Sequence, residues 1–269
     1  MTSSNSGRRA ASSWLRISNA LGTLHRRLAK VWPRGYHPYR VRGGWIYLDV
    51  RESPMMLARA LWAYEPSKVA ALTSLLPEGG TFIDVGANKG DFTILAADAV
   101  GATGRVLALE PESTNVEWLT RSVERNRFNN VTIEAAAASD HVGEATLFLG
   151  KTSGHHSLVT EPKFSNSTGT TTVPVRPLDD IVAAHGITSV DVIKIDVEGA
   201  EEQVLRGASA LLSGNAPMVI LLDLHPWVAD VPACLAILES HGFNLRDPDN
   251  FALPLRIRDD SVHELVAIR

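Results

Sequence analysis

The sequence predicts an α/β fold in which a doubly wound, mostly parallel sheet carries helices on both faces. Apolar, strand-like stretches alternate with stretches of helical periodicity from residue 67 to the C-terminus. The strand-like stretches are nearly continuous apolar runs, as expected where both faces of a sheet are covered. A glycine-containing turn joins the first of these strands to the next helix, as at the ligand-binding corner of doubly wound sheets.

The predicted elements follow one another in a regular order. Apolar residues at helical spacing predict helices, and short apolar runs between turn residues predict strands. In the first half, we expect helices at 67–76, 91–100 and 115–126, and strands at 81–86, 105–111 and 131–138. In the second half, we expect a helix that ends at 186, helices at 200–212 and 232–242, and strands at 190–197, 217–225, 243–247 and 264–269.

Residues 143–176 interrupt this alternation. EATLFLG and TTTVPVRPL read as antiparallel strands on either side of a loop rich in serine, threonine and glycine. We therefore predict an inserted β-hairpin at the edge of the sheet where a substrate would enter. His155 and His156 lie in the loop, either as surface residues or as groups that close over a substrate.

Composition indicates a globular domain. Apolar residues make up 45% of the 269 residues and charged residues 21%, which is ordinary for a soluble protein. Cys234 is the only cysteine, so an intrachain disulfide is excluded and a reducing compartment fits. The longest run without charge, 207–222, is too short to span a membrane. We expect a cytoplasmic protein, with peripheral attachment to a membrane as a further option.

The N-terminal segment differs in charge from the rest. Residues 1–48 contain nine lysines or arginines and no acidic residue, whereas the remainder has a net charge of −13. We therefore predict a basic N-terminal extension over 1–50 and one domain over 51–269. Residues 14–32 read as an amphipathic helix whose apolar stripe is Trp14, Ile17, Leu21, Leu24, Leu28 and Val31. This helix packs on its own domain or a sister subunit, lies on an anionic membrane, or belongs to a cleaved transit peptide.

The strongest motif is FIDVGANKGDFT, residues 82–93. Gly86 and Gly90 allow a tight turn and a close approach of backbone to ligand, with Asn88 between them. The Gly-x-Gly-x-x-Gly spacing of dinucleotide-binding loops is missing. Asp84 would also repel a pyrophosphate, so a cationic ligand with an amino group suits this corner better.

Two further elements extend this predicted cofactor site. Glu110 ends the next strand, where a carboxylate can accept hydrogen bonds from both ribose hydroxyls of an adenosine, or alternatively cap a helix. Ser139 and Asp140 follow the third strand, where Asp140 either accepts from an adenine amino group or is a plain turn residue. Together these positions predict a positively charged cofactor that carries adenosine, and S-adenosylmethionine is the candidate.

Residues 62–269 resemble the FkbM family of S-adenosylmethionine-dependent methyltransferases. FIDVGANKGDFT, LALEP, AASD, LDDI and IKIDVEGAEEQVLRGA match the family's pattern in order and spacing. The resemblance implies the Rossmann-like, class I methyltransferase sheet of seven strands with the last strand antiparallel. It also implies methyl transfer, usually to a hydroxyl oxygen. The histidines of GHHSL and Asp223, where a glutamate is common, depart from the pattern.

The stretch DVIKIDVEGAEEQVL, residues 191–205, divides into site residues and helix residues. Asp196 ends a strand and is expected to reach the crevice, and Glu198 lies on the border between site and helix. Glu201 and Glu202 are expected mainly to support the first turn of the helix, where negative charge is favoured. Lys194, inside a covered strand, is expected to pair with a carboxylate.

The acceptor side of the predicted site centres on a histidine. His225 follows the neighbouring strand and is placed to take a proton from an acceptor hydroxyl, with Asp196 as its orienting partner. The alternative is a packed or capping histidine before Pro226. A less favoured hypothesis has Asp196, Asp223 and His225 bind a divalent metal ion that activates the hydroxyl.

These observations predict an S-adenosylmethionine-dependent O-methyltransferase that acts on a hydroxyl of a sugar, glycan or secondary metabolite. Two other classes of function remain as alternatives. The first is an NAD-dependent oxidoreductase of Rossmann type, and the second is a non-catalytic, methyltransferase-like module that binds a partner through its basic helix. A nucleic-acid substrate is not expected, because the acidic body would repel a phosphate backbone.

Overall fold

A computed structural model describes residues 22–152, 156–159, 167–214, 216–256 and 262–269. Its centre is a seven-stranded sheet in the order β11–β12–β10–β9–β3–β4–β5. The strands are β3 (Thr81–Val85), β4 (Arg105–Leu109), β5 (Val131–Glu134), β9 (Val192–Ile195), β10 (Val219–Asp223), β11 (Asn244–Arg246) and β12 (Glu264–Ile268). β12, the last strand, is antiparallel to both neighbours, whereas β10, β9, β3, β4 and β5 are parallel. The predicted Rossmann-like, class I methyltransferase sheet is confirmed.

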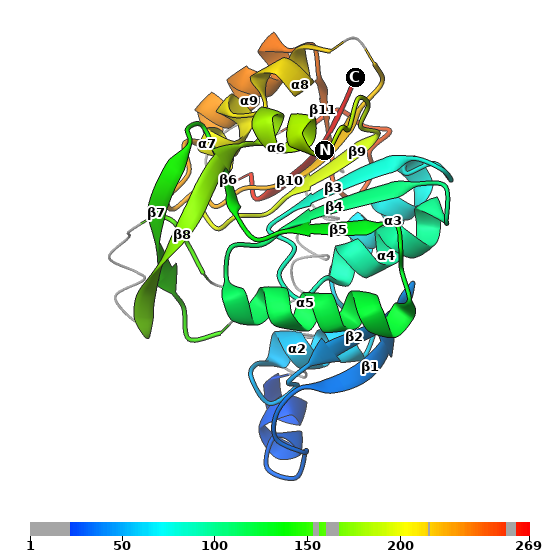
Figure 1. The fold of residues 1–269 in the computed structure, drawn as a ribbon, viewed down its shortest axis with the longest axis vertical. Coiled ribbons are helices and arrows are strands. Elements are labelled where there is room, and N and C mark those ends of the chain that lie inside the picture. Colours follow the sequence, from blue (N-terminus) through cyan, green and yellow to red (C-terminus); the bar gives the residue numbers. More distant parts are fainter. Residues whose placement is uncertain (1–21, 153–155, 160–166, 215, 257–261) are drawn as a thin grey trace, which may run out of the picture.

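Helices cover both faces of the sheet (Figure 1). One face packs against α3 (Pro66–Leu75) and α4 (Asp91–Val100), beside which lies α5 (Ser113–Asn126). The other packs against α6 (Leu178–Ala184), α7 (Glu201–Arg206), α8 (Ser209–Ser213) and α9 (Val231–Ser240). Side chains alternate accordingly: Phe82 belongs to the first core, and Ile83 and Val85 belong to the second.

The predicted helix at 200–212 is two short helices, α7 and α8, separated at Gly207. A side chain at Gly207 would overlap the carbonyl oxygen of Ser139, so the chain needs glycine where these segments meet. The carboxylate of Asp179 accepts hydrogen bonds from the backbone N–H groups of Ala210 and Leu211 and thereby caps α8. The helical pattern of the sequence is therefore interrupted by a tertiary contact.

The inserted hairpin is present and belongs to a second sheet. β7 (Gly143–Leu149) pairs antiparallel with β8 (Gly169–Pro177), and β6 (Ala137–Ser139) pairs with the other edge of β8. The predicted single strand at 131–138 is therefore wrong: β5 stays in the large sheet, and the chain leaves it before β6. In Figure 1 this small sheet stands beside the carboxyl ends of the central strands.

The N-terminal region contributes structure that the sequence did not predict. β1 (His37–Val41) and β2 (Gly44–Leu48) form an antiparallel hairpin, followed by α2 (Pro54–Ala60). The backbone N–H of Tyr47 donates to Ser122 Oγ of α5, and that of Trp45 donates to Asn126 Oδ1. This hairpin packs on the domain, so the predicted boundary at residue 50 divides a unit that the structure shows as joined.

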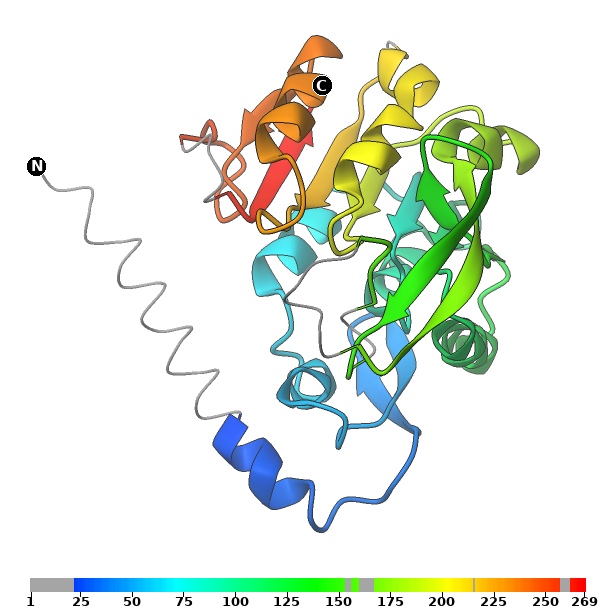
Figure 2. The same cartoon turned by 90° about the vertical axis from the view of Figure 1, so that its left-hand side faces the viewer.

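Residues 22–28 form a helix that projects from the body (Figure 2). Leu24 is 41% exposed and Val31, just beyond the helix, is 78% exposed, so these two members of the predicted apolar stripe are not covered by the described part of the domain. Trp14, Ile17 and Leu21 lie outside the described residues. Binding of 14–32 to a membrane or to a second copy stays a prediction. None of the helices that the structure describes combines the length and hydropathy needed to span a membrane.

Candidate active site

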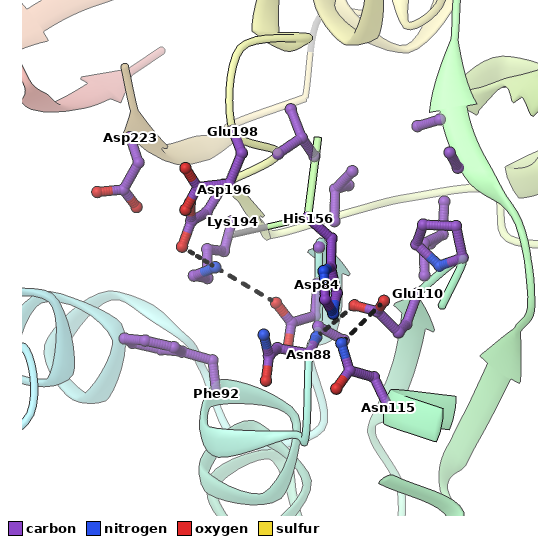
Figure 3. A pocket seen from close by; sticks show the side chains of 18 of the residues that line it. Asp84, Asn88, Phe92, Glu110, Asn115, His156, Lys194, Asp196, Glu198 and Asp223 are labelled. Carbon is purple, nitrogen blue, oxygen red and sulfur yellow. Dashed lines mark hydrogen bonds and ion pairs between the residues drawn. The ribbon is translucent and has the colours of Figure 1, made fainter. Parts of the chain in front are cut away.

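A cavity opens at the carboxyl ends of β3, β4, β9 and β10 (Figure 3). Loops after parallel strands meet at this edge, which is where doubly wound sheets bind ligands. The lining includes most of the predicted site residues: Asp84, Gly86, Asn88, Glu110, Asp196, Glu198, Asp223 and His225. In Figure 3, Glu110 and Asn115 lie on one side, and Asp196, Glu198 and Asp223 lie on the other.

The turn after β3 needs glycine at two positions for different reasons. Gly86 has φ +80°, and a side chain there would overlap the carbonyl oxygen of Asp196 on the neighbouring strand end. Gly90, with φ +97°, packs against Leu119 and begins α4. Gly86 lines the cavity and Gly90 does not, so Gly90 shapes the turn from behind. Asn88 also has positive φ, which asparagine tolerates better than most residues.

We expect Gly86→Ala to destabilise the fold by at least about 2 kcal/mol, because it adds a left-handed backbone penalty to a steric overlap. Gly186→Ala is the matched control, because Gly186 also has positive φ but nothing lies near its missing side chain. The control should cost only the backbone penalty of about 1 kcal/mol. Urea unfolding measures both, and equal losses would show that the contact with Asp196 is unimportant.

Asp84 lies at the centre of the cavity floor. It is 1% exposed, and its Oδ2 accepts a hydrogen bond from Thr93 Oγ1 (2.6 Å). Its Oδ1 has no hydrogen-bond partner among the described residues, and Lys194 Nζ lies 3.9 Å away. Burial raises the pKa of Asp84 and the charge of Lys194 opposes that rise. A buried acceptor without a donor fits a ligand that brings an ammonium or amino group.

Lys194 has the carboxylate partner that the sequence predicted. Its Nζ lies 3.2 Å from Asp196 Oδ2, and its ammonium sits over the ring of Phe92. Lys194 and Asp84 are register partners on adjacent parallel strands, which is why their side chains meet on one face. The charges of Asp196 and Asp84 keep this buried lysine charged: its pKa is raised although burial alone would lower it.

Glu110 is buried and held in a fixed orientation. Its Oε2 accepts from the backbone N–H of Asn88 (2.8 Å), and its Oε1 accepts from the backbone N–H of Glu112 (2.9 Å) and from Asn115 Nδ2 (3.3 Å). Burial raises its pKa to about 7 against these hydrogen bonds. The carboxylate lines the cavity, where its remaining lone pairs can accept hydroxyl groups.

Ser139 and Asp140 do not line the cavity, which corrects their predicted position. β6 pairs Ser139 with Pro177 of β8, and the Ser139 carbonyl packs against Gly207. The Asp140 side chain is 41% exposed and contacts His141 (2.8 Å). The sequence suggested that this segment ends a strand of the large sheet, whereas the chain has already left that sheet. Ala136, Ala137 and Ala138 line the cavity instead.

The side of the cavity opposite Glu110 (Figure 3) contains a buried histidine among carboxylates. His225 Nδ1 lies 2.7 Å from Glu201 Oε1, and its Nε2 lies 3.3 Å from Glu198 Oε2 and 4.0 Å from Asp196 Oδ1. Glu201, rather than Asp196, therefore orients the ring. Glu201 also accepts from the backbone N–H of Gly199 (3.0 Å), the local support that the sequence predicted. Glu202 pairs with Arg206 at the surface of α7.

The charges in this region act strongly on one another. Burial would lower the pKa of His225, but the hydrogen bond to Glu201 and the charges of Glu198 and Asp196 raise it to about 9. Burial and the charge of Asp196 raise the pKa of Glu198 to about 8. Burial also favours the neutral form of Asp196, yet Lys194, Lys68 and His225 outweigh it and hold this pKa below its usual range.

The ligand set proposed for a metal ion needs one replacement. Asp223 lines the cavity, but its Oδ1 is paired with Lys68 Nζ at 2.6 Å. Ligand atoms of Asp196, Glu198 and His225 instead lie within 4.8 Å of one another. Glu198, three residues beyond the end of β9, was the less certain site candidate from sequence, because a helix-supporting role explained it equally well.

Comparisons with known proteins identify the family of this chain. The family model described as the methyltransferase FkbM domain matches residues 84–245, from the aspartate on β3 to β11. This match covers more than half of the chain. The chain belongs to the FkbM methyltransferase family.

Two curated proteins are similar in sequence to this chain, and both are named as methyltransferases. A stretch of 201 residues is 27% identical to 31-O-demethyl-FK506 methyltransferase FkbM of Streptomyces tacrolimicus, covering 63% of this chain and 75% of that protein. A probable cobalt-precorrin-6B C(15)-methyltransferase (decarboxylating) of Sulfurisphaera tokodaii is 38% identical over 94 residues. That second match spans 33% of this chain and about half, 49%, of the relative.

Among solved structures, methyltransferase FkbM from Methylobacillus flagellatus KT matches with a TM-score of 0.47 and 18% identity. The match covers 82% of this chain and 54% of that chain.

The hairpin contributes to the cavity of this FkbM-family chain. His156 and Leu158 line it, and Ser157 Oγ donates to the carbonyl oxygen of Glu198, joining the hairpin to the turn after β9. His155 lies outside the described residues. The placement of His156 agrees with the option that the loop covers a substrate, and its contact with a substrate stays a prediction.

Sequence reasoning missed Arg59, which also lines the cavity. It is 5% exposed and reaches Asp91 (3.3 Å), Asn88 (3.3 Å) and the hydroxyl of Tyr64 (3.2 Å). Through these contacts α2 supports the turn after β3. A single arginine in a short helix gave no signal. The preceding β-hairpin did leave a signal in the sequence. Apolar residues (Val41, Ile46 and Leu48) flank the glycine turn at Gly43 and Gly44 at alternating positions.

Proposed function

We propose that this chain transfers a methyl group from S-adenosylmethionine to a hydroxyl oxygen of a small molecule or glycan. The observation that carries the proposal is that two different carboxylates line one cavity of an FkbM-family domain. Glu110 is held in a fixed orientation, and Asp84 has a buried oxygen without a hydrogen-bond partner among the described residues. The first suits ribose hydroxyls, and the second suits an amino group. An adenosine that carries an amino acid presents both.

The residues fit this cofactor. Glu110 would accept the ribose hydroxyls from its fixed position after β4, and Asp84 and the turn at 86–88 would hold the amino acid end. When bound, S-adenosylmethionine supplies a methyl group on a positively charged sulfur. The acidic lining of the cavity favours such a cation over the pyrophosphate of a dinucleotide, which argues against the oxidoreductase alternative.

The second group of residues would activate the acceptor. An alcohol becomes a good nucleophile only as its proton leaves. Asp196, Glu198 and His225 face the cavity beside the cofactor residues, and Glu201 sets the orientation of His225. The Streptomyces tacrolimicus relative is named as the methyltransferase of 31-O-demethyl-FK506, which supports an oxygen acceptor. Hydroxyls of sugars and secondary metabolites are the class that we propose.

An acceptor screen with isotope-labelled S-adenosylmethionine tests the proposal. We expect label in a hydroxyl compound from a panel of sugars, glycans and secondary-metabolite alcohols, and stoichiometric formation of S-adenosylhomocysteine. Transfer of label only to carbon or nitrogen acceptors would overturn the oxygen specificity. Absence of any transfer by a chain that binds S-adenosylhomocysteine would favour a non-catalytic module.

The pKa of Glu110 predicts how cofactor affinity depends on pH. Its ionised form accepts hydroxyl groups best, and its pKa is about 7 in the free protein. Protonation should therefore weaken binding of S-adenosylhomocysteine below neutral pH, by up to about tenfold per pH unit. Calorimetry from about pH 8 to about pH 6 measures this fall. Glu110→Gln should flatten the profile, and an equally steep profile in that variant would assign the effect to another group.

A further inference from the structure

We propose that Asp196, Glu198 and His225 bind a divalent metal ion with mixed oxygen and nitrogen ligands, of the Mn²⁺ or Zn²⁺ class. One ligand atom from each residue lies within 4.8 Å of the other two, close enough for a single ion to contact all three. Two carboxylates and one imidazole form a ligand set that suits first-row divalent ions. Three protein ligands also leave coordination positions open for another molecule.

The hydrogen bond that holds His225 is of the kind that metal-binding histidines make. Its Nδ1–H donates to Glu201 Oε1 at 2.7 Å, and Glu201 has no exposed surface. This hydrogen bond fixes the ring with Nε2 directed at Glu198 and Asp196, where a metal ion would take the place of the Nε2 proton. Metal-binding histidines commonly have their second ring nitrogen held by a carboxylate in this way.

The balance of charge points in the same direction. Lys194 pairs with Asp196, and Lys68 pairs with Asp223. Within the described part of the chain, Glu198 and Glu201 have only His225 as a cationic partner. Two largely buried carboxylates that share one imidazole are unfavourable unless further positive charge lies nearby. A divalent ion between Asp196, Glu198 and His225 supplies it.

The backbone of Glu198 is held in an uncommon conformation. Glu198 has φ +54°, which is unfavourable for a residue other than glycine and tends to occur at functional sites. Ser157 Oγ donates to its carbonyl oxygen, and the following Gly199 donates to Glu201. The turn thus directs the Glu198 side chain at His225 instead of leaving it in solvent as an ordinary first-turn acid.

The role of the ion rests on the proposed methyl transfer, whereas its binding does not. An acceptor hydroxyl in an open coordination position would ionise at a lower pH, with its O–H proton released to water and the oxygen left on the ion. His225 would then be a metal ligand and not the proton acceptor. The ligand class at this end of the cavity is therefore a hydroxyl compound bound through oxygen.

Titration of the chelator-treated full chain with Mn²⁺, followed by electron paramagnetic resonance, tests the site. We expect one bound Mn²⁺ per chain and a nitrogen hyperfine coupling from one imidazole. Asp196→Asn, Glu198→Gln and His225→Gln should each reduce affinity at least tenfold, and His225→Gln should also remove the nitrogen coupling. Glu201→Gln should reduce affinity about 10–100-fold through its hold on His225.

Glu202→Gln is the matched control, because Glu202 lies on the same helix turn but pairs with Arg206 at the surface. It should bind Mn²⁺ like the unchanged chain. Binding that survives the ligand substitutions would show an adventitious ion and overturn the site. Zn²⁺ binding is measured by calorimetry in the same chain. If the chain binds S-adenosylhomocysteine but neither Mn²⁺ nor Zn²⁺, the metal proposal is overturned and the proposed function stays intact. If the unchanged chain binds the metal ion but not S-adenosylhomocysteine, the proposed function is overturned and the metal site stands.

Discussion

Replacing His225 by glutamine is expected to lower the rate of methyl transfer by about 10²–10⁴-fold. His225 is held by Glu201 and directs Nε2 at the acceptor side of the cavity. Glutamine can still form hydrogen bonds, but it can neither carry a proton as an imidazole does nor replace an imidazole as a metal ligand. Single-turnover rates with labelled cofactor measure the effect. Affinity for S-adenosylhomocysteine should change only a few-fold, because the cofactor residues lie elsewhere.

The control is His241→Gln, since His241 follows α9 and contacts the backbone of Ile237 rather than the cavity. It should transfer methyl groups at the unchanged rate. A His225→Gln chain that retains more than a tenth of the activity would show that acceptor activation does not depend on this residue. The rate of methyl transfer would then come from the way the cavity holds the methyl donor and the acceptor in line.

Replacing Glu110 by alanine is expected to weaken binding of S-adenosylhomocysteine by at least about 100-fold. Hydrogen bonds to a charged group contribute about 1.5–3 kcal/mol each, and two ribose hydroxyls would lose such a partner. The substitution also leaves the N–H groups of Asn88 and Glu112 without their acceptor, so the turn after β3 loses part of its support. Calorimetry on the folded variant measures the affinity.

Glu117→Ala is the comparison for this experiment. Glu117 lies on α5, exposed and paired with Arg121, so its loss removes a carboxylate near the same helix without touching the cavity. Binding should be unchanged there. An unchanged affinity in Glu110→Ala would place the ribose away from Glu110.

The fold could be predicted because one physical rule covers most of it. Covered parallel strands must be mostly apolar, so β3, β4, β9 and β10 were visible as nearly continuous apolar runs, although β3 includes Asp84 and β9 includes Lys194. The prediction of one strand at 131–138 was wrong because a run of alanines suits a strand of either sheet. Only the pairing with β8 places β6 in the small sheet. Alternation around two glycines would have revealed the β1–β2 hairpin.

The site could be predicted to the extent that strand ends define it. Asp84, Glu110 and Asp196 were found because the carboxyl ends of adjacent parallel strands meet. Ser139 and Asp140 were misplaced with the strand that precedes them. The contact between Glu201 and His225 joins α7 to the segment after β10, residues 24 positions apart, and no local spacing encodes it. Arg59 was missed for the same reason.

Calorimetric titration of the full chain with S-adenosylmethionine and S-adenosylhomocysteine tests most directly whether the cavity beside Asp84 and Glu110 is a cofactor site. We expect one molecule of either compound to bind per chain, with a dissociation constant well below about 1 mM, which corresponds to about −4.1 kcal/mol. NAD should not compete. Absence of binding below about 1 mM for both compounds, with the chain folded, would contradict the account.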